Sequence, residues 1–85
     1  MAEIKVYTTK WSLDCDRAKE FLKDEGIFYE EIDIEKSSDG VRFVERANDG
    51  RRIVPTFDID GTVFSLKPFD WKKFQKELEK LGIEE

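Results

Sequence analysis

Four short stretches of the chain are rich in hydrophobic residues and predict β-strands. The first, residues 3–8, alternates apolar and polar positions, and the second covers residues 28–34. The other two, residues 53–59 and 62–66, flank Asp60-Gly61, a dipeptide typical of the type I′ turn in a hairpin. The pattern therefore predicts two separate strands and a later β-hairpin.

Between and after these strands, apolar residues recur at helical spacing in three segments. The first predicted helix runs from Leu13 to Glu25, with Ser12 as its N-cap and Gly26 as its left-handed end. Its apolar face consists of Cys15, Ala18, Phe21 and Leu22. We therefore expect this helix to bury Cys15.

The second predicted helix has a serine cap, Ser37 or Ser38, and closes at the turn residues 48–50. Gly40 lies in its first turn and weakens it, because glycine has a low helix propensity. The apolar residues of this helix are Val41, Phe43, Val44 and Ala47.

The third predicted helix begins near Pro68 or Asp70 and ends before Gly82. Its apolar face carries Trp71, Phe74, Leu78 and Leu81. The predicted order is βαβαββα, an α/β arrangement in which the first two strands are parallel. This order suits a four-stranded mixed sheet covered by three helices.

Composition and charge narrow the class of function. Eighty-five residues suffice for a single domain, residues 1–85, and 41% charged residues predict a well-solvated surface. The net charge of −5 comes from interspersed acids and bases, which argues against nucleic acid or a membrane as partner. No apolar run approaches about 20 residues and no signal-peptide core is present, so we expect a cytoplasmic monomer.

The sequence contains one cysteine and no histidine. An intramolecular disulfide is therefore impossible, and zinc centres and serine–histidine catalysis lack their usual ligand or base. We expect no metal and no tightly bound cofactor.

The single cysteine ends the segment Ser12-Leu13-Asp14-Cys15, where a strand passes through an aromatic turn into a helix. Redox proteins place Cys-x-x-Cys at such a helix start, because the unpaired N–H groups there favour a thiolate. In this chain the first position of that spacing is a serine.

The segment resembles the opening of a glutaredoxin, and more closely that of the mycoredoxin-like branch, in which a tryptophan precedes the redox motif. The residues that carry the resemblance are Val6-Tyr7-Thr8-Thr9, Trp11, Asp16-Arg17-Ala18-Lys19 and Gly50-Arg51-Arg52-Ile53-Val54-Pro55-Thr56. The resemblance implies the thioredoxin fold. It also marks two departures: Ser12 stands in place of the nucleophilic cysteine, and residues 65–68 stand where many glutaredoxins have a Gly-Gly pair that contacts glutathione.

Ser12 and Cys15 occupy the catalytic positions that the resemblance implies. A serine hydroxyl ionises too weakly to replace a thiolate unaided, and its base would have to be a lysine such as Lys10, so an N-cap is the stronger interpretation of Ser12. Cys15 lies on an apolar helix face between Asp14 and Asp16, so we expect a raised pKa and slow attack on disulfides. Cys15 is then either a small buried hydrophobic residue or a slow monothiol that forms mixed disulfides.

The resemblance further implies a groove for an extended thiol peptide, in which a cis Val54-Pro55 bond leaves the backbone of Val54 free to pair with the ligand. The predicted substrate-binding residues are Lys10, Trp11, Leu13, Arg52, Val54 and Pro55. Lys10, Arg51 and Arg52 either bind the carboxylates of glutathione or another low-molecular-weight thiol, or are solvated surface charges. Trp11 either lines the groove or plugs the loop onto the sheet.

Two functions follow from these residues. The first is a glutaredoxin-like thiol-disulfide oxidoreductase in which Ser-x-x-Cys replaces Cys-x-x-Cys, so that dithiol exchange with a disulfide-containing protein or a low-molecular-weight thiol is impaired or absent. The alternative is a redox-inactive thioredoxin-fold module that binds a peptide or thiol in the cis-proline groove. An iron–sulfur carrier is a weaker third choice, because it needs the first cysteine as a ligand.

Overall fold

The computed structural model describes residues 2–83, and within that range the order of elements is βαβαββα, as predicted. The strands are β1 (Ile4–Thr8), β2 (Glu30–Asp33), β3 (Thr56–Ile59) and β4 (Thr62–Ser65). The helices are α1 (Leu13–Asp24), α2 (Ser38–Ala47) and α3 (Trp71–Lys80).

The strands form one mixed sheet in the order β2-β1-β3-β4. β1 runs parallel to β2, with Val6 opposite Glu31, and antiparallel to β3, with Val6 opposite Phe57. β3 and β4 pair as an antiparallel hairpin, and its turn residues Asp60 and Gly61 both have the positive φ of a type I′ turn. The inner strand β1 therefore leads directly into the loop before α1.

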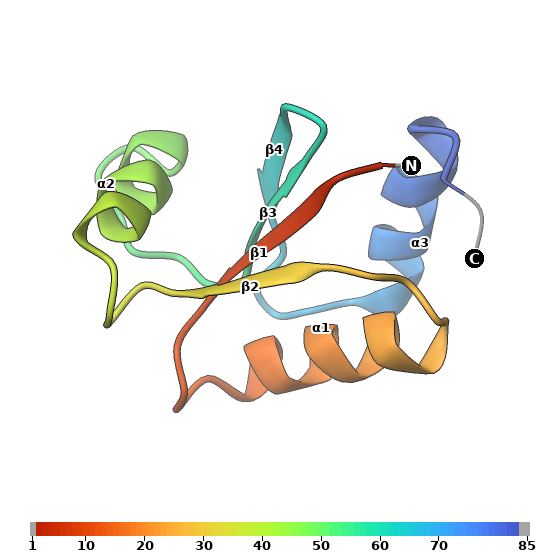
Figure 1. Cartoon of the computed structure of the whole chain (residues 1–85), viewed down its shortest axis with the longest axis horizontal. Helices are drawn as coiled ribbons and strands as arrows, with labels where there is room; N and C mark the ends of the chain where they lie inside the picture. The colour runs from red at the N-terminus through yellow and green to blue at the C-terminus, as the bar shows by residue number, and fades with distance from the viewer. Residues whose placement is uncertain (1, 84–85) are drawn as a thin grey trace.

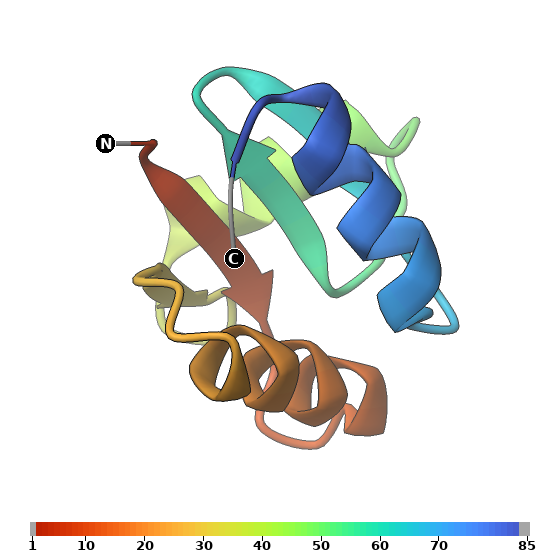
Figure 2. The same ribbon diagram turned by 90° about the vertical axis from the view of Figure 1, so that its right-hand side faces the viewer.

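Helices cover both faces of this sheet. Figure 1 shows α2 on one side and α1 and α3 on the other, and in Figure 2 α1 and α3 lie in front of the strands. The core that involves α1 and α3 consists of Ile4, Val6, Ala18, Leu22, Phe57, Ile59, Phe74 and Leu78. A second buried cluster consists of Tyr7, Cys15, Ile34, Val44 and Val54. Cys15 thus packs with the α2 side of the core although it lies on α1.

Capping residues explain where the helices begin and end. Ser12 accepts a hydrogen bond from the backbone N–H of Cys15, with 3.3 Å between nitrogen and oxygen, and caps α1 as predicted. Gly26 follows α1 with a φ of 69°, in the left-handed region expected of it. Ser37 caps α2 and Asp70 caps α3.

Gly40 has a packing role that helix propensity does not reveal. A Cβ atom at this position would lie 3.2 Å from Cγ2 of Ile32 in β2 and 3.2 Å from the Ser37 hydroxyl oxygen. The first turn of α2 therefore lies so close to the sheet that a side chain at residue 40 would require Ile32 or Ser37 to shift by a few tenths of an ångström.

All four strands are shorter than predicted, β1 and β4 by one residue and β2 and β3 by three. β2 begins at Glu30, the first residue that pairs with β1, whereas Phe28 lies outside the sheet with 83% of its surface exposed. β3 begins at Thr56 and not at Ile53, because Pro55 directly precedes the strand and proline has no N–H for the ladder.

The buried face of α3 is narrower than predicted. Phe74 and Leu78 are fully buried, but Trp71 is 51% exposed and Leu81 is 37% exposed. Trp71 lies at the start of the helix and stacks on Phe21 of α1, with 6.4 Å between the ring centroids. It covers the edge of the core and does not enter it.

A ring of polar side chains joins the end of α2 to the hairpin. The side-chain amide of Asn48 donates to the carbonyl oxygen of Val44 (2.8 Å) and to the hydroxyl of Thr56 (3.2 Å). The Ser65 hydroxyl donates to Oδ1 of Asn48 (2.9 Å) and lies 2.7 Å from the Thr56 hydroxyl. Thr56 also donates to the carbonyl oxygen of Ile53 at 2.7 Å. These contacts hold the segment before β3 against α2 and β4.

Candidate functional site

The loop after β1 brings Ser12 and Cys15 to the start of α1. Ser12 is 8% exposed, and Cys15, one turn into the helix, has no exposed surface. The burial of Cys15 agrees with its predicted place on the apolar face of the helix. The Ser12 position at the helix start therefore retains a small exposed surface, whereas the sulfur behind it has none.

Burial raises the pKa of the Cys15 thiol above its ordinary value. A hydrogen bond with Ser12, the backbone of Thr9 and the charge of Lys19 oppose this rise in the pKa, and the charge of Asp16 adds to it. The direction of this pKa shift is the expected one, and of the two predicted causes burial outweighs the charge of the flanking Asp16. Asp14 accepts the backbone N–H of Phe69 at 3.0 Å and so ties α1 to the segment before α3.

Sequence reasoning missed a charged network beside Cys15. Lys19 lies 2.9 Å from Oε2 of Glu31 in β2, and the same oxygen accepts a hydrogen bond from the Thr8 hydroxyl at 2.8 Å. The hydrogen bond between these two side chains lowers the pKa of the Glu31 carboxyl and raises the pKa of the Lys19 ammonium. The spacing of four residues between Cys15 and Lys19 is the signal in the sequence, because it places both on one side of α1.

Trp11 and Leu13 form an exposed apolar rim around Ser12. Trp11 is 71% exposed and Leu13 is 61% exposed. The indole N–H of Trp11 donates to Oε2 of Glu35 at 3.3 Å, which holds the ring beside the segment after β2. The alternative that Trp11 plugs the loop onto the sheet is wrong, because most of the ring faces solvent.

Val54 and Pro55 lie in a buried turn before β3. The Val54–Pro55 peptide bond is cis, and both side chains are fully or almost fully buried. The Val54 side chain belongs to the same cluster as Cys15. Among residues 2–83, the Val54 backbone N–H and C=O form no hydrogen bond. The structure therefore places an unpaired backbone segment in the same part of the core as the cysteine.

The predicted cations differ in their surroundings. Arg52 pairs with Glu45 of α2, with 3.1 Å between Nε and Oε2, although most of its side chain is exposed. Lys10 and Arg51 are exposed and form no ion pair within the described part of the chain. Lys10 and Arg51 are therefore available to an anionic ligand, and Arg52 would have to share its charge with Glu45.

Residues 2–83 contain neither a metal-binding cluster nor a membrane-spanning helix. No group of three or more histidine, cysteine, aspartate or glutamate side chains could hold a metal ion. No helix in this range is long and apolar enough to cross a bilayer.

We expect Cys15 to react slowly with a thiol reagent such as 5,5′-dithiobis(2-nitrobenzoate). At pH 8 the folded chain should react at least about tenfold more slowly than the urea-unfolded chain, because reaction requires local opening. Since folding raises the pKa of Cys15, the rate should still rise with pH at about pH 9, where an ordinary cysteine with a pKa of about 8.5 is mostly ionised. Equal rates for the folded and unfolded chains would contradict the burial of the sulfur.

Comparison with known proteins settles the family. The sequence model of the glutaredoxin family matches residues 4–64. The chain belongs to the glutaredoxin family. Mycoredoxin 1 of Corynebacterium glutamicum is 36% identical over 64 residues, which cover 73% of this chain and 77% of the mycoredoxin. A Mycobacterium tuberculosis relative is 42% identical over 55 residues, which cover 65% of this chain and 66% of the relative.

Solved structures confirm the thioredoxin fold of this glutaredoxin. The T8A mutant of the thioredoxin-like protein BC3987 superposes with a TM-score of 0.77 at 33% identity, over 93% of this chain and 97% of that protein. A buckwheat glutaredoxin in complex with glutathione superposes with a TM-score of 0.70 over 89% of this chain and 71% of the buckwheat protein. At 20% identity the buckwheat comparison shows the fold alone.

Proposed function

We propose that this glutaredoxin is a thiol-disulfide oxidoreductase in which Ser12 replaces the attacking cysteine, so that the chain performs little or no dithiol exchange. In such an exchange, a thiolate attacks a disulfide sulfur, forms a mixed disulfide and releases the other sulfur as a thiolate. A second thiol of the enzyme then resolves the mixed disulfide. In this chain only the position of the second thiol, residue 15, is a cysteine.

The observation that carries the proposal is the arrangement of Ser12 in front of a fully buried Cys15. The N-terminus of α1 is the place where a thiolate gains most from unpaired N–H groups and the helix dipole. Ser12 occupies it, and its hydroxyl serves as the N-cap. Cys15 has no exposed surface and a raised pKa, so it is poorly suited to make the first attack.

The surroundings of Ser12 support a thiol-containing substrate. The unpaired Val54 backbone can pair with an extended peptide, and Trp11 and Leu13 offer apolar contact beside it. Lys10 and Arg51 can attract the carboxylates of a small thiol. The buckwheat complex supports glutathione as one candidate co-substrate, because the same fold holds it there.

The second candidate function is a redox-inactive module that binds a peptide or a low-molecular-weight thiol beside Val54 and Pro55. The complete burial of Cys15 favours it, because a binding role does not require an exposed sulfur. The two candidates share the binding surface and differ in whether a cysteine at position 12 would make the chain active.

The experiment that tests the proposal is a coupled glutathione-reductase assay of the unmodified chain with the mixed disulfide of glutathione and 2-mercaptoethanol. We expect a rate equal to that of the matched Cys15→Ala variant, which retains the fold but has no sulfur at either position. Robust turnover that disappears in Cys15→Ala would show that Cys15 acts as a nucleophile, and would contradict the proposed impairment.

A further inference from the structure

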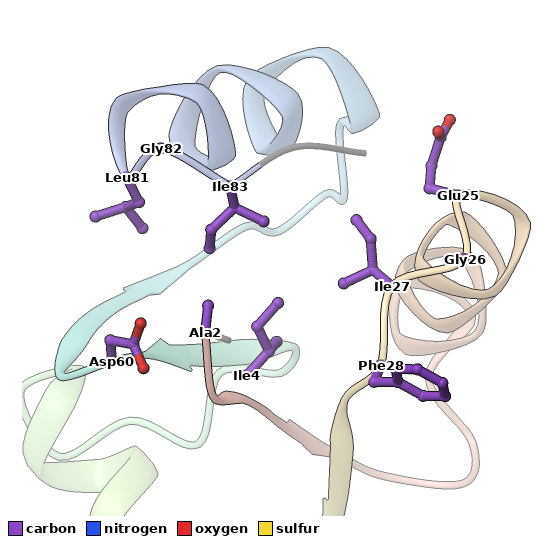
Figure 3. Close-up of a pocket in the computed structure, with 10 residues that line it drawn as sticks. All are labelled: Ala2, Ile4, Glu25, Gly26, Ile27, Phe28, Asp60, Leu81, Gly82 and Ile83. Atoms are coloured by element: carbon purple, nitrogen blue, oxygen red, sulfur yellow. The ribbon is translucent and has the colours of Figure 1, made fainter.

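A pocket of about 620 Å³ opens at the end of β1 that lies opposite the Ser12 loop. Figure 3 shows its apolar side chains converging from three directions: Ile4 from β1, Ile27 from the segment after α1, and Leu81 and Ile83 from the segment after α3. Phe28, the most exposed large hydrophobic residue in the described range, lies at its edge. The volume falls within the range of about 300–1,000 Å³ that small-molecule sites occupy.

Two copies of the same helix-ending motif build the walls of the pocket. After α1, the backbone N–H of Ile27 donates to the carbonyl oxygen of Leu22, and after α3 the N–H of Ile83 donates to Leu78, both at 2.9 Å. In each case a glycine with positive φ precedes the isoleucine, Gly26 at 69° and Gly82 at 74°. This hydrogen-bond pattern is that of a Schellman motif, which turns the chain and packs the isoleucine back toward its helix. The pocket is therefore preformed by backbone hydrogen bonds.

The ionisable side chains that line the pocket are both carboxylates, Glu25 and Asp60. In Figure 3 they stand at opposite ends of the pocket: the Asp60 carboxylate is directed toward Ala2, whereas the Glu25 carboxylate points away from the isoleucines. Neither forms an ion pair within residues 2–83, and Asp60 accepts a hydrogen bond from the backbone N–H of Glu3 at 2.8 Å. Among residues 2–83, no lysine or arginine lines the pocket. An apolar cavity with only negative groups at its rim favours a ligand with an apolar body and a positive charge.

We propose that this pocket binds a small amphipathic amine, an alkyl or aryl group that carries one ammonium. The isoleucines would remove the apolar body from water, while Asp60, with the more distant charge of Glu25, would attract the ammonium and repel an acid of the same shape. A second copy of the chain fits less well, because each copy carries a net charge of −5 and presents the same acidic rim.

The pocket is separate from the proposed redox site. Ile4 lines it at the beginning of β1, and the loop that contains Ser12 starts after Thr8 at the other end of the strand. The four residue steps from Ile4 to Thr8 span about 13 Å. Binding in the pocket should therefore be unchanged in Cys15→Ala. The pocket can thus be tested independently of the proposed redox function.

The test is an NMR titration of the full chain that follows the methyl groups of Ile4, Ile27 and Ile83. The probes are hexylammonium, hexanol and hexanoate, which have the same alkyl body and different charges. We expect saturable shifts with about millimolar affinity for hexylammonium. Hexanol should bind about two- to five-fold more weakly and hexanoate more weakly still, with differences that shrink at high salt.

Substitutions in the chain identify the groups responsible for the charge preference and for the apolar contact. Asp60→Asn removes the charge, keeps an oxygen for the Glu3 N–H and tolerates positive φ, so it should reduce the preference for hexylammonium over hexanol about two- to five-fold. Asp49→Asn is the matched control, because Asp49 is an exposed aspartate with a φ of 53° that does not line the pocket. Ala2→Leu, which extends a methyl group that points into the pocket, should weaken binding of all three probes.

Several outcomes would overturn the inference. They are an absence of saturable shifts with hexylammonium, equal binding of hexylammonium and hexanoate, equal effects of Asp60→Asn and Asp49→Asn, and unchanged binding in Ala2→Leu. Each of them can be read from a chain that retains its native spectrum elsewhere, so a loss of folding would not be mistaken for a loss of binding.

Discussion

Ser12→Cys should give the chain a glutathione-dependent disulfide reductase activity at least about a thousandfold above that of the unmodified chain. The substitution replaces the N-cap oxygen by sulfur at the start of α1, where Ser12 already accepts the backbone N–H of Cys15. A thiolate at such a position is stabilised by the same N–H groups, and its pKa should lie below the ordinary value of about 8.5. The measurement is the rate of the coupled assay as a function of pH.

Three variants make this prediction specific. Ser12→Ala should stay inactive, since it changes the cap but adds no sulfur. Ser12→Cys combined with Cys15→Ala tests whether one cysteine at position 12 suffices, and any lower rate measures the contribution of Cys15 as the resolving thiol. If Ser12→Cys folds normally and has no activity, the binding-module alternative replaces the oxidoreductase proposal.

Phe74→Ala should have the largest effect on stability of any single substitution considered for this chain. Phe74 is fully buried, stacks on Phe57 with 4.5 Å between ring centroids and meets Phe21 edge-on at 5.6 Å. Truncating such a phenylalanine removes its buried area and leaves a cavity, at a cost of about 3–5 kcal/mol. Native domains have total stabilities of about 5–15 kcal/mol, so the variant should lose a large part of its free energy of unfolding.

Phe28→Ala is the matched control for Phe74→Ala. It removes the same side chain from a position that is 83% exposed, and the free energy of unfolding should change by no more than about 0.5 kcal/mol. Urea denaturation followed by circular dichroism measures both values. Equal losses of stability in the two variants would mean that the aromatic cluster around Phe74 is not the centre of the core.

Local signals in the sequence predicted the order of elements and most of their limits. Ser12, Gly26 and the pair Asp60-Gly61 each act through their own backbone geometry, a cap, a left-handed end and a tight turn, and this geometry depends little on the rest of the chain. Helical spacing placed Cys15 on a buried face for a similar reason. These features could be inferred from one sequence because they are decided within a few residues.

Features that depend on a neighbouring element could not be inferred. The apolar residue Phe28 suggested a longer β2, but the parallel register with β1 begins only at Glu30. The close approach of Gly40 to Ile32 depends on how α2 packs on the sheet. In the candidate site, the partner of Lys19 is Glu31, which comes from β2 and is not a neighbour in the sequence.

The polar ring of Asn48, Thr56 and Ser65 contains fewer hydroxyl hydrogens than its contacts require. The hydroxyl of Thr56 lies at hydrogen-bond distance from the Ile53 carbonyl oxygen and from the Ser65 hydroxyl, and Ser65 also faces Oδ1 of Asn48. Each hydroxyl has one hydrogen to donate, so two hydrogens serve three oxygen–oxygen contacts. A ligand N–H that donates to Ile53, just before Val54, would release the Thr56 hydrogen for Ser65. Each acceptor oxygen of the ring would then have a donor, and the Thr56 and Ile53 oxygens, now without a hydrogen between them, would move apart.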